Sequence, residues 1–474
     1  MSRKLNWMER YYISRNTNDY YTNFNIVAKY NHRITPTLLS HALHSVLQEN
    51  IWLTYNVFKS DSRADAETNG HNWELRSVDQ IDFEEVVSFE KKSQFGEATF
   101  AELNRYKCPM NVDNLPLWRI IVYELPNDDQ YICAYFDHCL YDGLSGLEFQ
   151  KDLVKALSEV KEDTPLEFIY DKNRDSHPLP KSLIPATTDQ INIYQPTYYQ
   201  ILSHYFNKYL PLVSKTWNYL ISLILKDPWK PNLNVNPVFT PGREYPNTEI
   251  STGLINFNPT EVQKIYQYCK SQNITLTPYF HAICLKCLED TIFPAIDPSH
   301  KFSSTSITAI NGRRYFPQGT PFRYGCIIAP DFLSLPPVLD QTRSFMGRIQ
   351  TILNSQIKSR LSFREMAMLQ YFNFWSFFER YKSPQGRCTL TVSNLGRVPD
   401  SGKKFKIVDA YFGLSTGIMY NFVLNMITTE EGGLNVNLNY LPAYEELYAG
   451  EKKVMDVFMA RFREKLLNFP EEQN

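Results

Sequence analysis

Hydrophobic and polar positions along the chain follow a rhythm of strands and helices that occurs twice. In the first half, the polar turn "PNDDQ" separates two apolar runs, "PLWRIIVYEL" and "YICAYFDH", and this pattern predicts a β-hairpin. A helix is expected before it in "TPTLLSHALHSVLQEN", where the leucines share one side and Pro36 lies near the start. Another is expected from about Leu144 to Leu157.

The second half repeats the rhythm. The strand "STGLINFN" precedes two expected helices, "PTEVQKIYQYCKSQN" and "TLTPYFHAICLKCLEDTI". The further strands expected are "KFSSTSITAING", "CTLTVSNLG", "IVDAYFGLSTG", "YNFVLNMITTEEGG" and "LNVNLNYLP". Near the end of the chain, apolar residues at helical spacing predict a final amphipathic helix. We therefore expect an α/β protein with two halves, each a mixed sheet covered by helices, and the strand order stays open.

Proline residues separate the two halves. Nine prolines lie between Pro178 and Pro241, a density that interrupts regular elements. The chain of 474 residues is also too long for one ordinary core. We therefore expect three segments, with residues 1–180 as the first subdomain, 181–244 as a crossover, and 245–474 as the second subdomain.

Composition and charge exclude several classes of protein. The chain is 43% hydrophobic and 21% charged, as is typical of a folded globular protein. Its net charge is −2, and without a basic excess we expect no nucleic-acid partner. The eight cysteines have no regular spacing and suggest free thiols in a reducing compartment. The N-terminal segment has no apolar run of the signal-peptide kind, so we expect a cytoplasmic protein.

The residues at the end of the hairpin carry the candidate chemistry. His138 follows a strand that is apolar on both faces, and such strand ends hold reactive groups rigidly at an exposed loop. A histidine can take and return a proton near neutral pH. Asp142 follows one turn later, and Gly143 permits a tight exit into the helix. Taken alone, the motif equally fits a histidine that ends a strand and an aspartate that caps a helix.

The wider sequence resembles the fungal alcohol acetyltransferase family, within the H-x-x-x-D-G superfamily of acyl-CoA-dependent acyltransferases. The resemblance starts from "HCLYDGLSGLEFQKDL" and recurs in order along most of the chain. The other matching segments are "DYYTNFNIVAKYN", "PLWRIIVYEL", "INFNPTEVQKI", "ITLTPYFHAICLKCL", "AINGRRYFP", "FRYGCIIAP", "LTVSNLGRV" and "AYFGLSTG". It implies two chloramphenicol acetyltransferase-like subdomains with the active-site channel between them.

Two differences from subfamily motifs argue against two branches of this superfamily. Peptide-synthetase condensation domains usually carry a doubled histidine, whereas Asp137 precedes His138 here. Plant-type relatives end with a D-F-G-W-G motif, whereas "YFGLSTG" is the nearest feature of this chain. We therefore do not expect a carrier-protein thioester as the acyl donor.

The resemblance also implies roles for individual residues. His138 would be the general base that deprotonates an acceptor as it attacks acetyl-CoA, the co-substrate, with no permanently bound cofactor. Asp142 would pair with an arginine and fix the loop together with Gly143. Arg313 is the first candidate for that arginine and Arg314 the second.

Further residues are expected at the site, and each also has a purely structural or surface interpretation. Ser393 and Asn394, in the "SNLG" turn that ends a strand, would donate to the oxyanion or border the channel, or else form a plain turn. Lys403, Lys404 and Lys406 would hold CoA phosphates, or else be solvated surface. His281, Cys284 and Cys287 lie on one apolar helix face and are predicted to belong to the core, so no metal site is expected.

The expected acceptor is an apolar alcohol, a sterol or a sphingoid-like long-chain amine, and the choice between O- and N-transfer stays open. Residues 198–225 are strongly apolar, with a fresh helix from Pro211. They would form a packed crossover helix, a helix lying on a membrane, or a wall of the acceptor channel. The protein would then be a cytoplasmic monomer, peripheral on the endoplasmic reticulum or on lipid droplets. The alternative is a non-catalytic acyl-lipid binding protein on the same scaffold.

Overall fold

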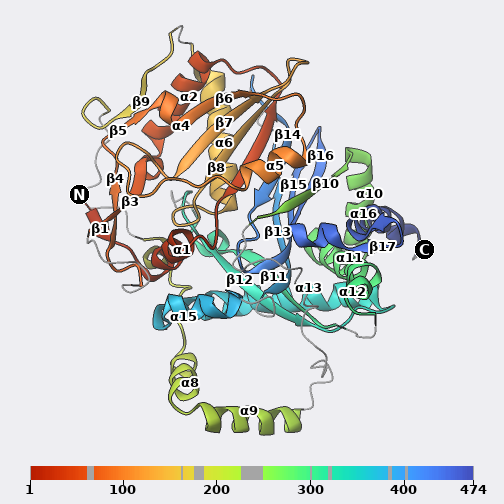
Figure 1. Cartoon of the computed structure of the whole chain (residues 1–474). Helices are drawn as coiled ribbons and strands as arrows, with labels where there is room; N and C mark the ends of the chain where they lie inside the picture. The colour runs from red at the N-terminus through yellow and green to blue at the C-terminus, as the bar shows by residue number, and fades with distance from the viewer. Residues whose placement is uncertain are drawn as a thin grey trace.

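Two large mixed sheets with covering helices organise the computed structural model (Figure 1). The described residues are 2–60, 69–161, 164–175, 186–225, 249–298, 302–318, 323–382, 387–400 and 404–472. The first sheet has five strands in the order β14-β2-β8-β7-β6, and the second has six in the order β10-β16-β15-β13-β11-β12. We call each sheet with its helices the first and the second lobe. The two-lobed α/β fold expected from the sequence is confirmed.

The first lobe is built around the hairpin that the sequence predicts. Its strands are β2 (Phe24–Tyr30), β6 (Val87–Lys91), β7 (Trp118–Glu124), β8 (Gln130–Phe136) and β14 (Ile407–Leu414). β7 and β8 pair antiparallel, and β6 joins β7 in parallel. Helices α2 (Pro36–Glu49) and α6 (Gly143–Glu159) pack against each other and bury their leucines.

The second lobe contains the parallel pairs β11–β13 and β13–β15. Its strands are β10 (Ser251–Phe257), β11 (Ser304–Asn311), β12 (Ile328–Leu335), β13 (Cys388–Arg397), β15 (Tyr420–Thr429) and β16 (Gly433–Tyr440). Its main helices are α10 (Pro259–Ser271), α11 (Leu276–Asp290), α13 (Thr342–Ser359) and α16 (Val454–Glu472). His281, Cys284 and Cys287 are buried in its core, as the sequence predicts. All eight cysteines are buried, and none forms a disulfide.

Shorter elements complete the described chain. The short strands are β1 (Ser2–Lys4), β3 (Tyr55–Lys59), β4 (Trp73–Ser77), β5 (Gln80–Asp82), β9 (Phe168–Asp171), β17 (Tyr448–Ala449) and β18 (Lys452–Lys453). The remaining α-helices are α1 (Trp7–Thr17), α4 (Phe83–Val86), α5 (Glu97–Leu103), α7 (Thr187–Gln190), α8 (Tyr198–Tyr209), α9 (Pro211–Leu225), α12 (Ile292–Ile296), α14 (Leu361–Ala367) and α15 (Phe374–Glu379). The 3₁₀ turns are Ile51–Thr54, Gly312–Tyr315, Met368–Tyr371, Arg380–Lys382 and Pro442–Glu446.

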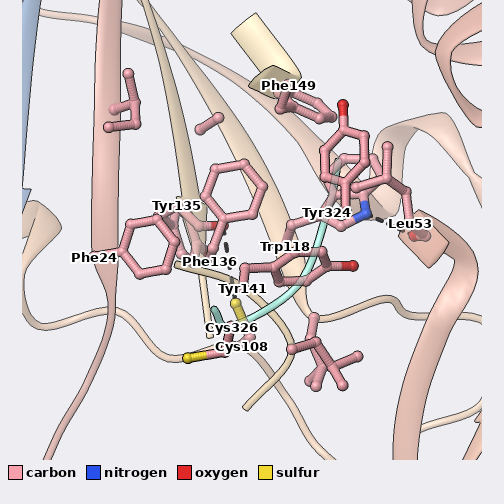
Figure 2. Packing of buried hydrophobic residues seen from close by; sticks show 14 of the residues in the cluster. Phe24, Leu53, Cys108, Trp118, Tyr135, Phe136, Tyr141, Phe149, Tyr324 and Cys326 are labelled. Atoms are coloured by element: carbon pink, nitrogen blue, oxygen red, sulfur yellow. Dashed lines mark hydrogen bonds between the residues drawn. The ribbon is translucent and has the colours of Figure 1, made fainter. Parts of the chain in front are cut away.

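The second half of the chain contributes segments to the first lobe. Strand β14, from the second half of the chain, pairs antiparallel with β2 at the edge of the first sheet. Tyr324 and Cys326, which precede β12, are buried in the same cluster as Trp118 and Phe136 of the first lobe (Figure 2). The segment boundaries 1–180, 181–244 and 245–474 stay a prediction. The contacts of β14, Tyr324 and Cys326 with the first lobe connect the two halves of the sequence.

Helices α8 and α9 extend away from the two lobes as a separate arm (Figure 1). α8 has no buried residue, and many large apolar side chains of the arm are exposed to solvent. The described part of residues 198–225 therefore does not form the packed crossover helix that was one of the three expectations. Across the described residues, no helix combines the length and the apolar character that a bilayer span requires.

Candidate active site

His138 stands two residues beyond the end of β8, at the entrance to the loop that leads into α6. Its ring stacks on Tyr12 with a centroid distance of 5.2 Å, and Phe24 packs on it at 4.7 Å. The side chain is 8% exposed, and it lines a cavity whose walls are mainly apolar. The end of a buried strand thus presents the His138 imidazole to a cavity lined mainly by apolar side chains.

One nitrogen of this imidazole is occupied. Nδ1 lies 2.9 Å from the carbonyl oxygen of Tyr141, which can only accept, so Nδ1 carries the proton and Nε2 the lone pair. Burial, and next the charge of Arg15, lower the pKa of His138 to about 4. The ring is therefore neutral at physiological pH and has one basic nitrogen.

Asp142 does not contact that ring through a hydrogen bond. Its carboxylate is fully buried and accepts two hydrogen bonds from Arg313, at 2.6 Å from Nη1 and 2.9 Å from Nη2. It also caps α6 through the amide of Ser145, and it accepts from the amide of Ile327 beside β12. Burial opposes ionisation, but Arg313 and these amides hold the pKa of Asp142 below its usual value. The carboxylate ties the histidine loop to the second lobe.

The sequence suggested both a cap and an ion pair for Asp142, and the geometry combines them. Arg313 lies in the turn Gly312–Tyr315 and also donates to the carbonyl oxygens of Arg323 and Gly325. The neighbouring Arg314 is exposed. Of the two candidate arginines, Arg313 is therefore the one in contact with the loop.

Gly143 serves packing rather than an unusual turn. It is not among the residues with a left-handed φ, although the sequence reading relied on its conformational freedom. A Cβ on Gly143 would lie 2.8 Å from the side chain of Leu395 and 3.3 Å from Phe412. The absence of a side chain lets the start of α6 approach β13 and β14 closely.

The cavity has a volume of about 540 Å³ and lies where the lobes meet. Alternate residues of three neighbouring strands form one wall, as the two-residue period of a strand requires. These wall residues are Ile307, Ala309 and Asn311 of β11, Ile328, Pro330 and Phe332 of β12, and Thr391 and Ser393 of β13. α1, the His138 loop, α8 and the segment 365–377 close the other sides. This volume is in the range of small-molecule sites.

Ser393 and Asn394 both line the cavity, but not in a turn. They lie inside β13, where the pairing with β15 shifts register, and Gly396 has a φ of +80°. The side-chain oxygen of Asn394 accepts from the amide of Gly396, and its nitrogen lies 3.4 Å from the Thr277 hydroxyl. Among the described residues the Ser393 hydroxyl has no such partner, which leaves it the better donor to a ligand.

Two of the three candidate lysines, Lys404 and Lys406, lie within the described residues. Lys406 pairs with Glu431 near the start of β14, and Lys404 lies over the ring of Phe405. Lys403 lies outside the described residues. Neither of the two described lysines is among the residues that line the cavity.

Sequence reasoning missed Arg15 and the tyrosines around it. α1 supplies Tyr11, Tyr12 and Arg15 to the cavity, and Tyr21 follows before β2. The only sequence signal is that Arg15 follows Tyr12 by three positions and Tyr11 by four on a helix, a spacing that equally fits an exposed helix surface. α8 was expected in one reading to be a channel wall, and it contributes Tyr199, Gln200, Ser203, His204 and Asn207.

No group of three or more histidine, cysteine, aspartate or glutamate side chains assembles into a metal site within the described ranges. The chemical groups in this mainly apolar cavity include a neutral imidazole, a serine hydroxyl, a guanidinium and the carboxyl group of Glu365, whose pKa is raised by burial.

Comparisons with known proteins agree over almost the whole chain. The family described as alcohol acetyltransferase matches residues 4–465. The N-acetyltransferase SLI1 of Saccharomyces cerevisiae is 23% identical over 464 residues, which cover 93% of this chain and 95% of that protein. Alcohol O-acetyltransferase 2 of the same yeast is 23% identical over 505 residues, with 92% and 91% covered.

Solved structures show the same fold at low identity. The trichothecene 15-O-acetyltransferase TRI3 of Fusarium sporotrichioides superposes with a TM-score of 0.68 at 12% identity, covering 99% of this chain and 95% of that one. The first condensation domain of the CDA synthetase has a TM-score of 0.59 at 10% identity, with 98% and 95% covered.

Proposed function

Because the chain belongs to the alcohol acetyltransferase family and is an acyltransferase, we propose that it moves the acetyl group of acetyl-CoA to an apolar alcohol or amine, with His138 as general base. One observation carries the proposal: a neutral imidazole, with Nδ1 bound to a carbonyl and Nε2 basic, lines an apolar cavity between the lobes. No permanently bound cofactor takes part.

Nε2 removes the proton of the acceptor hydroxyl or amine as the acceptor oxygen or nitrogen attacks the thioester carbonyl. A tetrahedral oxyanion forms, and its collapse breaks the carbon–sulfur bond. The CoA thiolate leaves and takes the proton back from the imidazolium, so the base is regenerated. General-base assistance of this kind is typically worth about 10²–10⁴-fold in rate.

Other residues support this step without taking the proton. The Asp142–Arg313 pair holds the loop between β8 and α6 in place, and Gly143 lets that loop approach β13. Ser393 donates to the oxyanion, whereas the side-chain nitrogen of Asn394, the other possible donor, lies 3.4 Å from the Thr277 hydroxyl. A role of Lys403, Lys404 and Lys406 toward the CoA phosphates stays a prediction, with no support from the position of Lys406 beside Glu431.

The apolar acceptor reaches the cavity from a lipid surface through the α8–α9 arm. Leu202, Leu212 and Trp217 are 69%, 79% and 59% exposed, an unusual display for side chains that favour apolar surroundings. α8 connects this arm to the cavity, which it lines. The protein would therefore act in the cytoplasm as a monomer, peripheral on the endoplasmic reticulum or on lipid droplets.

An acceptor panel tests the function. Purified protein with acetyl-CoA is offered isoamyl alcohol, dodecanol, a sterol and a sphingoid amine, and the released thiol is followed with a disulfide reagent. Thiol release that depends on an acceptor supports the transfer, and the responding acceptor distinguishes O- from N-transfer. If no acceptor releases thiol, the scaffold is a non-catalytic acyl-lipid binding protein instead.

A further inference from the structure

Arg15 brings a positive charge into the same cavity. It lies near the end of α1, is 4% exposed, and lines the cavity together with Tyr11 and Tyr12. Its guanidinium carbon lies 4.4 Å from the ring centre of Tyr21 and 5.6 Å from that of Tyr12. Tyr12 in turn stacks on His138, so one aromatic ring separates the guanidinium from the imidazole.

No described carboxylate forms an ion pair with this guanidinium, although the Glu365 carboxyl lines the same cavity. The guanidinium also forms no hydrogen bond with any described residue, and its Nε is buried without an acceptor. The Asp137 carboxylate is close enough to feel the charge of Arg15, but the Asn16 side chain and the Cys139 amide bind it. Tyrosine rings surround the guanidinium carbon at 4.4–5.8 Å, and such rings do not accept the hydrogen bonds that its N–H groups can donate in plane.

A buried, uncompensated charge is costly, and a planar guanidinium matches a carboxylate through two parallel hydrogen bonds. The missing partner of Arg15 is therefore an anion that enters with a ligand. It has to reach the reacting centre, because Arg15 lies one ring from His138.

Resting on the proposed function, we propose that Arg15 binds a carboxylate of the acceptor, and that the preferred acceptors are long-chain hydroxy or amino acids. The apolar chain lies along the cavity wall formed by β11, β12 and β13. The carboxylate pairs with Arg15, and the hydroxyl or amine, a few bonds away, faces His138. The same charge disfavours a simple long-chain ammonium ion, which has no group to neutralise it.

Two other anions fit less well. The diphosphate of CoA is separated from its thioester by the whole pantetheine arm, so it cannot lie beside His138 while the thioester does. The oxyanion of the tetrahedral intermediate forms at the reacting carbon with every acceptor, and a residue that stabilises it serves all acceptors equally.

A matched pair of acceptors tests the proposal: β-hydroxydodecanoate and its methyl ester, which share chain and nucleophile and differ in charge. With the full-length enzyme and acetyl-CoA, kcat/KM for the acid should exceed that for the ester by about 10–100-fold, the usual worth of a hydrogen-bonded charge pair. Arg15→Leu should abolish this preference, because it should lower kcat/KM for the acid about 10–100-fold more than kcat/KM for the ester. Arg10→Met on the same helix is the control and should keep the wild-type preference, because Arg10 does not line the cavity.

Equal rates for acid and ester in the wild type would overturn the proposal, and so would an equal loss for both acceptors in Arg15→Leu, which would assign Arg15 to the oxyanion. If Arg15→Leu fails to fold, the wild type still decides: dodecanoate should inhibit dodecanol acetylation far more strongly than methyl dodecanoate does. Similar inhibition by the two would refute carboxylate binding. Dodecanol acetylation by the wild type tests the proposed function separately, so the two failures can be told apart.

Discussion

Nδ1 of His138 lies 2.9 Å from the carbonyl oxygen of Tyr141, three residues further along the same loop. This backbone carbonyl therefore keeps the proton on Nδ1 and leaves Nε2 basic, so no carboxylate next to the histidine is needed to fix the tautomer. Asp142 is free for a different task, the ion pair with Arg313 that joins the loop to the second lobe. The aspartate of this loop thus forms its hydrogen bonds with Arg313, Ser145 and the Ile327 amide, and none with the ring of His138.

Replacing the proposed base should remove turnover without unfolding the protein. We expect His138→Ala to lower kcat by about 10²–10⁴-fold, the usual worth of general-base assistance. Thiol release with dodecanol measures this loss, and thermal melting measures stability. His281→Leu is the control, because His281 is also buried but lies in the core of the second lobe. Full activity in His138→Ala would rule out this histidine as the base.

The low pKa of His138 predicts an unusual pH profile. Burial and Arg15 lower the pKa of His138 to about 4, so the base stays unprotonated well below pH 6.5. With a neutral alcohol as acceptor, log kcat/KM should stay level from neutral pH to about pH 5 and fall only below it. An unperturbed histidine would instead lose activity below about pH 6.5.

The neighbouring Asp137 could produce an acid limb of its own, because burial raises its pKa to about 6. Asp137→Asn separates the two groups. If the acid limb belongs to His138, it should keep its place near pH 4–5 in this variant; a limb that disappears would belong to Asp137 instead.

Breaking the ion pair from the arginine side should destabilise the fold. Arg313→Met leaves the fully buried Asp142 carboxylate without its partner, and we expect it to lower the free energy of unfolding by about 3–5 kcal/mol. Urea denaturation gives this difference. Arg314→Met, at the adjacent exposed position, should stay within about 0.5 kcal/mol of the wild type. Equal effects of the two substitutions would contradict the assignment.

The serine on β13 should matter for the chemical step. Ser393→Ala removes the proposed oxyanion donor, and losing one such donor typically costs about 10²–10³-fold in kcat. KM for acetyl-CoA should change little, because the interaction strengthens only as the oxyanion forms. Thr391→Val, two residues earlier on the same face, is the comparison. If kcat falls less in Ser393→Ala than in Thr391→Val, Thr391 would be the oxyanion donor instead of Ser393.

The exposed arm should bind lipid. We expect the combined Leu202→Glu, Leu212→Glu and Trp217→Glu variant to lose binding to vesicles of neutral phospholipid, since burying one such side chain is worth about 1.5–3 kcal/mol. Co-sedimentation measures the loss, and activity on a water-soluble alcohol should be kept. Tyr266→Glu with Tyr448→Glu changes exposed aromatic residues elsewhere and should leave binding intact. If the wild type instead self-associates through the arm, size-exclusion chromatography will show a dimer that the variant lacks.

The periodicity of apolar residues was sufficient to predict the individual helices and strands, because each of them is determined by residues that are neighbours in sequence. The β7–β8 hairpin, the helix after His138 and the break at Pro211 lie where the spacing of apolar residues, prolines and turn residues predicts them. The two-lobed architecture and the family were also within reach, since the motif around His138 and the later segments occur in order.

Contacts between residues far apart in the sequence could not be predicted, because they depend on how the sheets are assembled. The chain alone suggested two arginines for Asp142, and only the folded molecule brings Arg313 and the Ile327 amide to that carboxylate. It likewise moves β14 into the first sheet and places Arg15 one ring from His138. A sequence records which side chains are present, but burial and long-range packing determine which of them share a cavity, and therefore which charges are left without a partner until a ligand arrives.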